Sequence, residues 1–128
     1  MVWNIVLEGH VILWVEVTEG FLEWLRPSVR DALVAGIDPY ADSVLTAEMQ
    51  QRWLDELKRI ETELQIQAST RIALKKPLPR VPAVRSTVQK TLVERELRNH
   101  PQAQKVSELR ATLELALESG STISALGD

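Results

Sequence analysis

Cysteine is absent from the 128 residues of this sequence. Disulfide bonds, thiolate metal sites and a cysteine nucleophile are therefore excluded, and the absence is typical of proteins of the reducing cytoplasm. Histidine is scarce as well: His10 and His100 lie far apart, and neither belongs to a metal-binding spacing such as H-E-x-x-H. Walker loops, dinucleotide fingerprints and nucleophile elbows are missing too. We therefore expect a non-enzymatic, cytoplasmic protein without catalytic residues or a cofactor.

A long uninterrupted hydrophobic run is also lacking. The N-terminal stretch "MVWNIVLEGHVILWVEV" is apolar, but Glu8, Gly9, His10 and Glu16 interrupt it. A membrane-spanning helix needs roughly 18 consecutive apolar residues, and a signal peptide needs a basic start and a small-residue cleavage site. We interpret this stretch as part of the hydrophobic core and expect no contact with a membrane.

The composition that remains is that of one folded domain, which we expect to span residues 1–128. Apolar residues make up 45% of the chain and charged residues 26%, which is ordinary for a globular protein. The net charge of −3 is unevenly spread: residues 1–70 hold 5 Lys/Arg and 12 Asp/Glu, whereas residues 71–100 hold 8 and 2. The sequence therefore predicts an acidic part, 1–70, followed by a basic segment, 71–100.

The clearest predicted helix follows Thr46. Apolar residues recur there at steps of three and four, which predicts an amphipathic helix of about five turns; they are Met49, Trp53, Leu57, Ile60 and Leu64. Thr46 is the natural N-cap, because its hydroxyl can accept a hydrogen bond from an amide of the first turn. A shorter helix is predicted to begin at Pro27 and to end at Gly36.

The C-terminal part predicts a helical hairpin over residues 86–120. Ser86 and Gln89 form a capping box for its first helix, Pro101 suits the first position of its second helix, and Gly120 is a suitable C-cap. The residues after Gly120 have the composition of a polar tail. Several prolines within residues 71–85 favour an extended Pro-rich linker between this hairpin and the preceding helix.

The first 25 residues allow two interpretations. Trp14, Val17, Phe21 and Leu25 follow a helical spacing, whereas residues 2–17 are β-branched enough to form two strands that turn at residues 8–10. We favour the helix. The predicted fold class is therefore all-α, a compact bundle of four to five helices, with an α+β fold that carries an N-terminal β-hairpin as the alternative.

The segment "GIDPYADSVLTAEM", residues 36–49, lies between two predicted helices and resembles a degenerate single EF-hand. Asp38 occupies the first ligand position of the calcium loop and Asp42 the fifth. Val44 offers its carbonyl at the seventh position, and Thr46 falls at the ninth. This resemblance implies calcium binding by these four residues as one alternative function.

Three positions of the same segment depart from the calcium signature. Tyr40 stands at a carboxylate position, Ser43 replaces the glycine, and Met49 replaces the bidentate glutamate. We therefore prefer a structural turn with a capped helix. As an alternative, the turn presents Asp38, Tyr40 and Asp42 to a protein partner.

The same loop supports a second resemblance. The residues "IDPYADSVLTAEM", the following "LDEL" and the final "LGD" are similar to a group of small uncharacterised bacterial proteins with D-P-Y-G-D-T-V-F-like loops. Ala41 and Leu45 differ from that pattern. The resemblance implies no known activity.

The basic segment is a candidate nucleic-acid face through Lys75, Lys76, Arg80 and Arg85, since phosphate neutralisation dominates such affinity. No aromatic residue follows position 53, however, so nothing in this segment can stack on bases. We favour a solvated basic face, with nucleic-acid association through residues 71–100 as an alternative function. In gross form the chain resembles bacterial immunity proteins and other stoichiometric inhibitors. It is interpreted as a protein-interaction or regulatory module with an unidentified protein partner, able also to form a homodimer.

Overall fold

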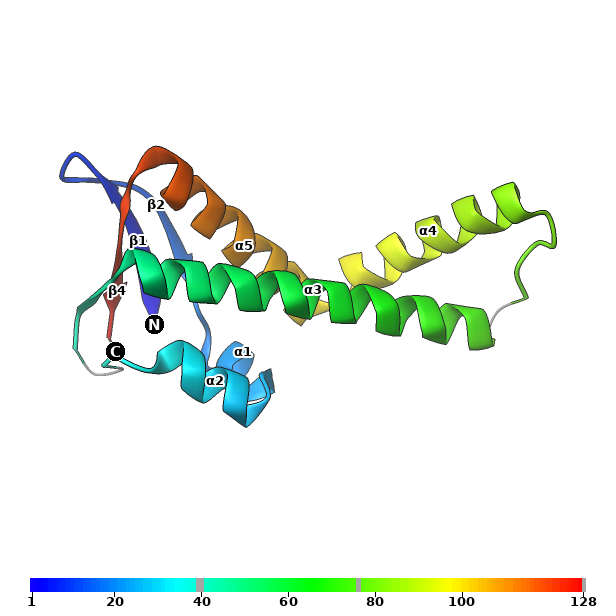
Figure 1. Cartoon of the computed structure of the whole chain (residues 1–128), viewed down its shortest axis with the longest axis horizontal. Coiled ribbons are helices and arrows are strands. Elements are labelled where there is room, and N and C mark those ends of the chain that lie inside the picture. The colour runs from blue at the N-terminus through cyan, green and yellow to red at the C-terminus, as the bar shows by residue number, and fades with distance from the viewer. Residues whose placement is uncertain (39–40, 76, 128) are drawn as a thin grey trace.

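The computed structural model describes residues 1–38, 41–75 and 77–127, with the Lys75 side chain left out (Figure 1). Helices and a sheet are both present in the described residues. In chain order they are β1 (Val2–Leu7), β2 (His10–Glu16), α1 (Glu19–Trp24), α2 (Pro27–Val34), β3 (Ser43–Leu45), α3 (Ala47–Lys75), α4 (Pro82–Arg98), α5 (Pro101–Ser119) and β4 (Thr122–Leu126). The all-α prediction is therefore wrong, and the α+β alternative with an N-terminal hairpin is confirmed.

The hairpin of β1 and β2 replaces the helix expected up to Leu25. Its turn consists of Glu8 and Gly9, whose φ angles of 52° and 81° are both positive. Two successive positive φ angles are characteristic of the type I′ turn, which matches the twist of the flanking strands. The helical spacing was misleading because it crosses an element boundary: Trp14 lies on β2, whereas Phe21 lies on α1 after the N-cap Thr18.

The four strands form an antiparallel sheet in the order β2-β1-β4-β3. The C-terminal strand β4 is central, between β1 and the short β3. The expected polar tail after Gly120 is therefore wrong. Alternation explains the strand, because Ile123 and Ala125 are buried while Thr122 and Ser124 are not.

One face of the sheet is covered by α3 and α5 (Figure 1). Strand residues on this face are buried, and the main ones are Trp3, Ile5, Val15, Leu45, Ile123 and Ala125. The helices bury Trp53, Leu57, Leu109 and Leu113 against them. The hydrophobic core therefore lies between the sheet and the two helices.

Helix α3 begins where the sequence predicts, because the backbone N–H of Met49 donates to Thr46 Oγ1 at 3.2 Å. It is longer than expected, however, and continues for 29 residues to Lys75. The stripe of buried residues extends through Ala68 and Ile72, and residues 65–75 contain no helix breaker. The predicted linker over 71–85 is consequently wrong in its bounds.

Helix α4 begins at Pro82 and not after Ser86, since proline is well tolerated at the first helical position. Its expected hairpin with α5 is also wrong. Both α4 and α5 pack chiefly against α3, α5 along its first half and α4 along its second half (Figure 1). We call residues 65–75 of α3 together with α4 the arm, because these helices project away from the sheet.

Candidate functional site

The structure separates the loop residues that the sequence singles out. Asp38 follows α2, Asp42 is exposed before β3, Val44 lies within β3, and Thr46 caps α3. Tyr40 lies outside the described residues. The partner-binding set and the metal set are thus spread over a turn, a strand and a helix cap.

The described part of this loop does not have the backbone of a calcium loop. Ser43 stands where an EF-hand needs a left-handed glycine, but it begins β3, which pairs with β4. Among the described non-glycine residues, only Glu8 has a positive φ angle. No group of three or more His, Cys, Asp or Glu side chains that could hold a metal ion occurs among the described residues. This geometry does not favour the calcium alternative.

The basic segment forms most of α4 and its approach. Arg80 and Arg85 are exposed near the tip of the arm, whereas Lys76 and the side chain of Lys75 lie outside the described part. Arg71 already forms an ion pair with Glu96, with its Nε 2.7 Å from Glu96 Oε1. Binding of a phosphate by Arg71 would require this ion pair to break. The arm therefore presents separated cations and no aromatic platform, and nucleic-acid binding stays an unfavoured alternative.

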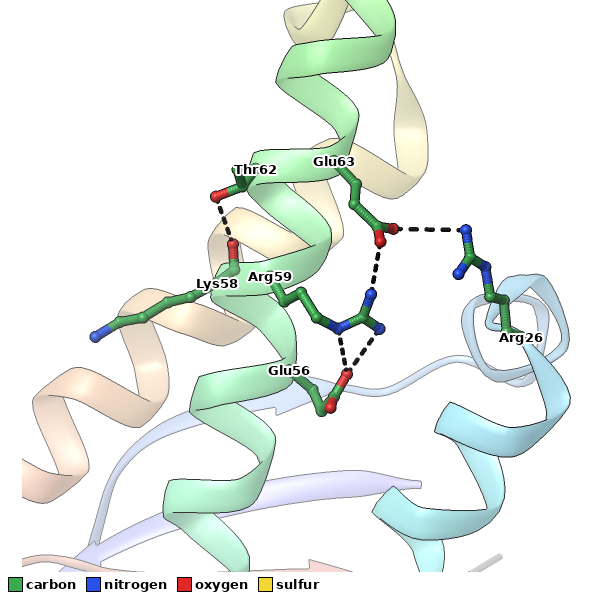
Figure 2. A network of polar contacts seen from close by, with 6 residues as sticks. All are labelled: Arg26, Glu56, Lys58, Arg59, Thr62 and Glu63. Atoms are coloured by element: carbon green, nitrogen blue, oxygen red, sulfur yellow. Dashed lines mark hydrogen bonds and ion pairs between the residues drawn. The ribbon is translucent and has the colours of Figure 1, made fainter.

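A cavity of about 210 Å³ lies where α1 and α2 meet α3. Its lining includes Trp24, Val29, Ile60, Arg26, Arg59 and Glu63. Figure 2 shows that these charges are already engaged: Arg59 donates to Glu63 at 2.6 Å and to Glu56 at 2.8 Å, and Glu63 also pairs with Arg26 at 3.8 Å. The hydrogen bond to Glu56 raises the pKa of Arg59 above its usual value. With its charges compensated, this cavity has no evident ligand preference.

Among the described helices, none lies over the opposite face of the sheet (Figure 1). Residues in register across this face include Trp14, Asn4, Ser124 and Val44, one on each strand. Trp14 is 64% exposed, Val44 57% and Val11 55%. An antiparallel sheet with one solvated face normally places polar side chains there, so this much apolar area is unusual.

The outer edge of β2 adds to this face. Within the described residues β2 pairs only with β1, so no strand covers its other edge, although Lys105 Nζ donates to the Glu16 carbonyl oxygen at 3.0 Å. A bulge at Ile12 interrupts the pairing, while Leu13–Glu16 remain regular. Open apolar edges are sites at which other chains add a strand, and charges or bulges normally limit this. We call the uncovered face together with this edge the sheet surface.

The sheet surface was not predicted from the sequence. One signal was available: in "HVILWVE", apolar residues fall on both faces of a strand instead of alternating with polar ones. That pattern indicates a strand covered on both sides. Because the run was assigned to a helix, its second apolar face was attributed to the core.

Comparison with known proteins gives no relative from which a role could be transferred. No family model, curated protein or solved structure matches the chain. Among the described residues, no helix combines the length and apolar character needed to cross a membrane.

Proposed function

We propose that this chain is a non-enzymatic protein-binding module and that the sheet surface is its binding site. The exposed indole of Trp14 is the observation that carries this proposal. Covering a fully exposed tryptophan removes about 150–250 Å² from water. Because Trp14 is 64% exposed, covering it corresponds to roughly 2–4 kcal/mol. Tryptophan is also among the residues that most often dominate binding energy at interfaces.

The charge around the sheet surface indicates the chemistry of the partner. The four strands and the turn between β1 and β2 contain Glu8 and Glu16 but no Lys or Arg, and the one neighbouring cation shown, Lys105 of α5, donates to the Glu16 carbonyl oxygen and lies 3.2 Å from Glu108. A partner with an apolar centre and a basic rim would pair with these carboxylates, and opposite charges accelerate and orient association. The same acidic rim disfavours a second copy of this chain on the sheet surface. We therefore assign the surface to a basic protein.

The shape of the surface supports a protein more than a small molecule. It consists of an open sheet face and a strand edge, and both accept an extended segment of another chain or a flat apolar patch. Such a module acts by covering its partner in a fixed ratio. This is how stoichiometric inhibitors and regulatory proteins work, and it is the role we propose.

Site-specific crosslinking followed by binding measurements tests the proposal. A photo-reactive amino acid at position 11, beside Trp14, identifies the neighbouring protein in the source cell, with the same group at exposed Leu74 as the matched control. The captured protein is then purified and titrated. We expect Trp14→Ser to weaken binding by about 30-fold or more, the loss typical of an interface hot spot. Glu16→Lys should also weaken binding, and the loss of affinity should be larger at low salt than at high salt.

Two outcomes would refute this role. One is equal capture from positions 11 and 74; the other is a purified partner whose affinity is unchanged by Trp14→Ser. Because Trp14 is exposed, its replacement leaves the core intact, and a circular dichroism spectrum verifies this. A partner with an acidic contact surface would contradict the charge assignment.

A further inference from the structure

The arm has an incomplete core. Helix α4 has no buried residue over its 17 positions, although it packs along α3. Its half-buried residues form a broad stripe, and they are Val88, Gln89, Leu92, Val93, Glu96 and Leu97. On α3, Ile66 is 61% exposed. Two helices alone cannot bury a stripe of this width, and bundles complete it with further helices.

A groove of about 500 Å³ runs between the two helices on one side of the arm. Val93 and Leu97 line it from α4, and Ile66 lines it from α3. Gln89 Nε2 donates to Ser69 Oγ at 2.6 Å and joins the two helices within it. The groove therefore combines an apolar lining with a polar link that is already satisfied.

Two opposite charges line the same groove, one helical turn apart on α4. They are Lys90 and Glu94. Among the described residues neither forms an ion pair, and a lysine that precedes a glutamate by four residues is the less favourable order within a helix. Two copies of α4 can pack antiparallel with the two-fold axis midway between residues 90 and 94. In that arrangement Lys90 of each copy meets Glu94 of the other. Such reciprocal pairing is the signature of a two-fold interface.

We propose that a second copy of this chain docks its arm antiparallel on this groove and that the two arms form a four-helix bundle. Ile66 of each copy covers the apolar groove of the other, and the two Lys90–Glu94 pairs set the register. The antiparallel order also places the basic tips, with Arg80 and Arg85, at opposite ends of the bundle. The sheet surface takes no part, so this inference is independent of the proposed function.

The available area agrees with a modest dimer. A helix of 17 residues is about 25 Å long, and two helices side by side are roughly 20 Å wide. One face of the arm therefore offers about 500 Å², and two copies bury about 1,000 Å² in total. This is close to the lower limit for a specific interface, so the dimer should dissociate on dilution.

Charge reversal in the full-length chain tests the register. Sedimentation velocity is run from roughly 1 to 200 µM, where an interface of this size is expected to dissociate. Lys90→Glu and Glu94→Lys should each weaken the dimer at least tenfold, because each places like charges opposite one another twice. An equimolar mixture of these two variants should form heterodimers, and the variant that carries both changes should again form homodimers. Arg95→Glu, an exposed reversal on the same helix outside the groove, is the control.

Substitutions at apolar positions provide a second test. Ile66→Glu should abolish the dimer, whereas Leu74→Glu, at an 82% exposed position outside the groove, should not affect it. A wild-type chain that stays monomeric up to about 200 µM overturns the proposal. So does a dimer that survives Ile66→Glu but dissociates with Trp14→Glu, which would place the second copy on the sheet surface. Failure of mixed charge variants to associate overturns the antiparallel register.

Discussion

Trp3 and Trp53 meet edge to face in the core, with ring centroids 4.8 Å apart and planes at 85°. The contact joins β1 to α3, and both side chains are fully buried. The two indoles are not equivalent, however. Trp53 Nε1 donates to the carbonyl oxygen of Leu33 at 3.0 Å, whereas Trp3 Nε1 is buried without a hydrogen-bond partner among the described residues.

This difference predicts unequal effects of the same substitution. Trp53→Phe leaves the Leu33 carbonyl without its donor and also removes core volume, so we expect a loss of about 3–4 kcal/mol in the free energy of unfolding. Trp3→Phe removes volume but also removes an unsatisfied N–H, so its cost should be about 1–2 kcal/mol. Urea unfolding of the two variants measures the difference. A larger loss for Trp3→Phe would show that the Leu33 hydrogen bond is unimportant.

Gly36 ends α2 in a conformation that favours glycine. Its φ angle is 82°, and an added Cβ would lie 2.7 Å from Met49 Cε. Because the methionine end is flexible, backbone strain should dominate, and we expect Gly36→Ala to reduce the free energy of unfolding by about 1–2 kcal/mol.

Gly20 is the matched control for this substitution. It lies within α1, its φ angle is not positive, and apart from its chain neighbours and the backbone of its own helix no atom lies within 4 Å of an added Cβ. Gly20→Ala should raise stability by up to about 1 kcal/mol, the difference in helix propensity. Thermal unfolding of both variants should therefore shift the melting temperature in opposite directions, and shifts of the same sign would contradict this account.

The N-cap of α3 allows the structural and calcium interpretations of the loop to be separated. Thr46→Ala removes the bond to the Met49 amide and should cost about 1 kcal/mol, while Thr46→Ser should retain most of it. Calcium near 1 mM should not change the melting temperature of the wild type, because the loop lacks the glycine geometry and the bidentate glutamate of a calcium site. Micromolar heat of calcium binding in titration calorimetry, lost in Asp38→Ala, would restore the metal alternative.

The candidate surface was less predictable than the elements around it. The loop residues Asp38 and Asp42 attracted attention because their spacing resembles a known motif, whereas Trp14 was interpreted as a core residue. Exposure of a tryptophan depends on which elements cover it. In the part of the chain that the structure describes, no helix covers the outer face of β2, and this arrangement is decided by contacts between segments distant in sequence (Figure 1).

Residues that act on their immediate neighbours determined the parts that were predicted correctly. Pro27 and Pro101 begin helices because proline fits the first helical position, Gly36 and Gly120 end them with positive φ angles, and Thr46 caps α3 through its own hydroxyl. The tertiary structure alone decided that the N-terminal stretch is a hairpin and that residues 122–126 lie at the centre of the sheet. A strand is stabilised by hydrogen bonds to partners far away in the sequence, and β4 lies beside β1, more than one hundred residues earlier. Caps and turns can therefore be predicted locally, whereas the sheet and its uncovered face exist only once distant strands have paired.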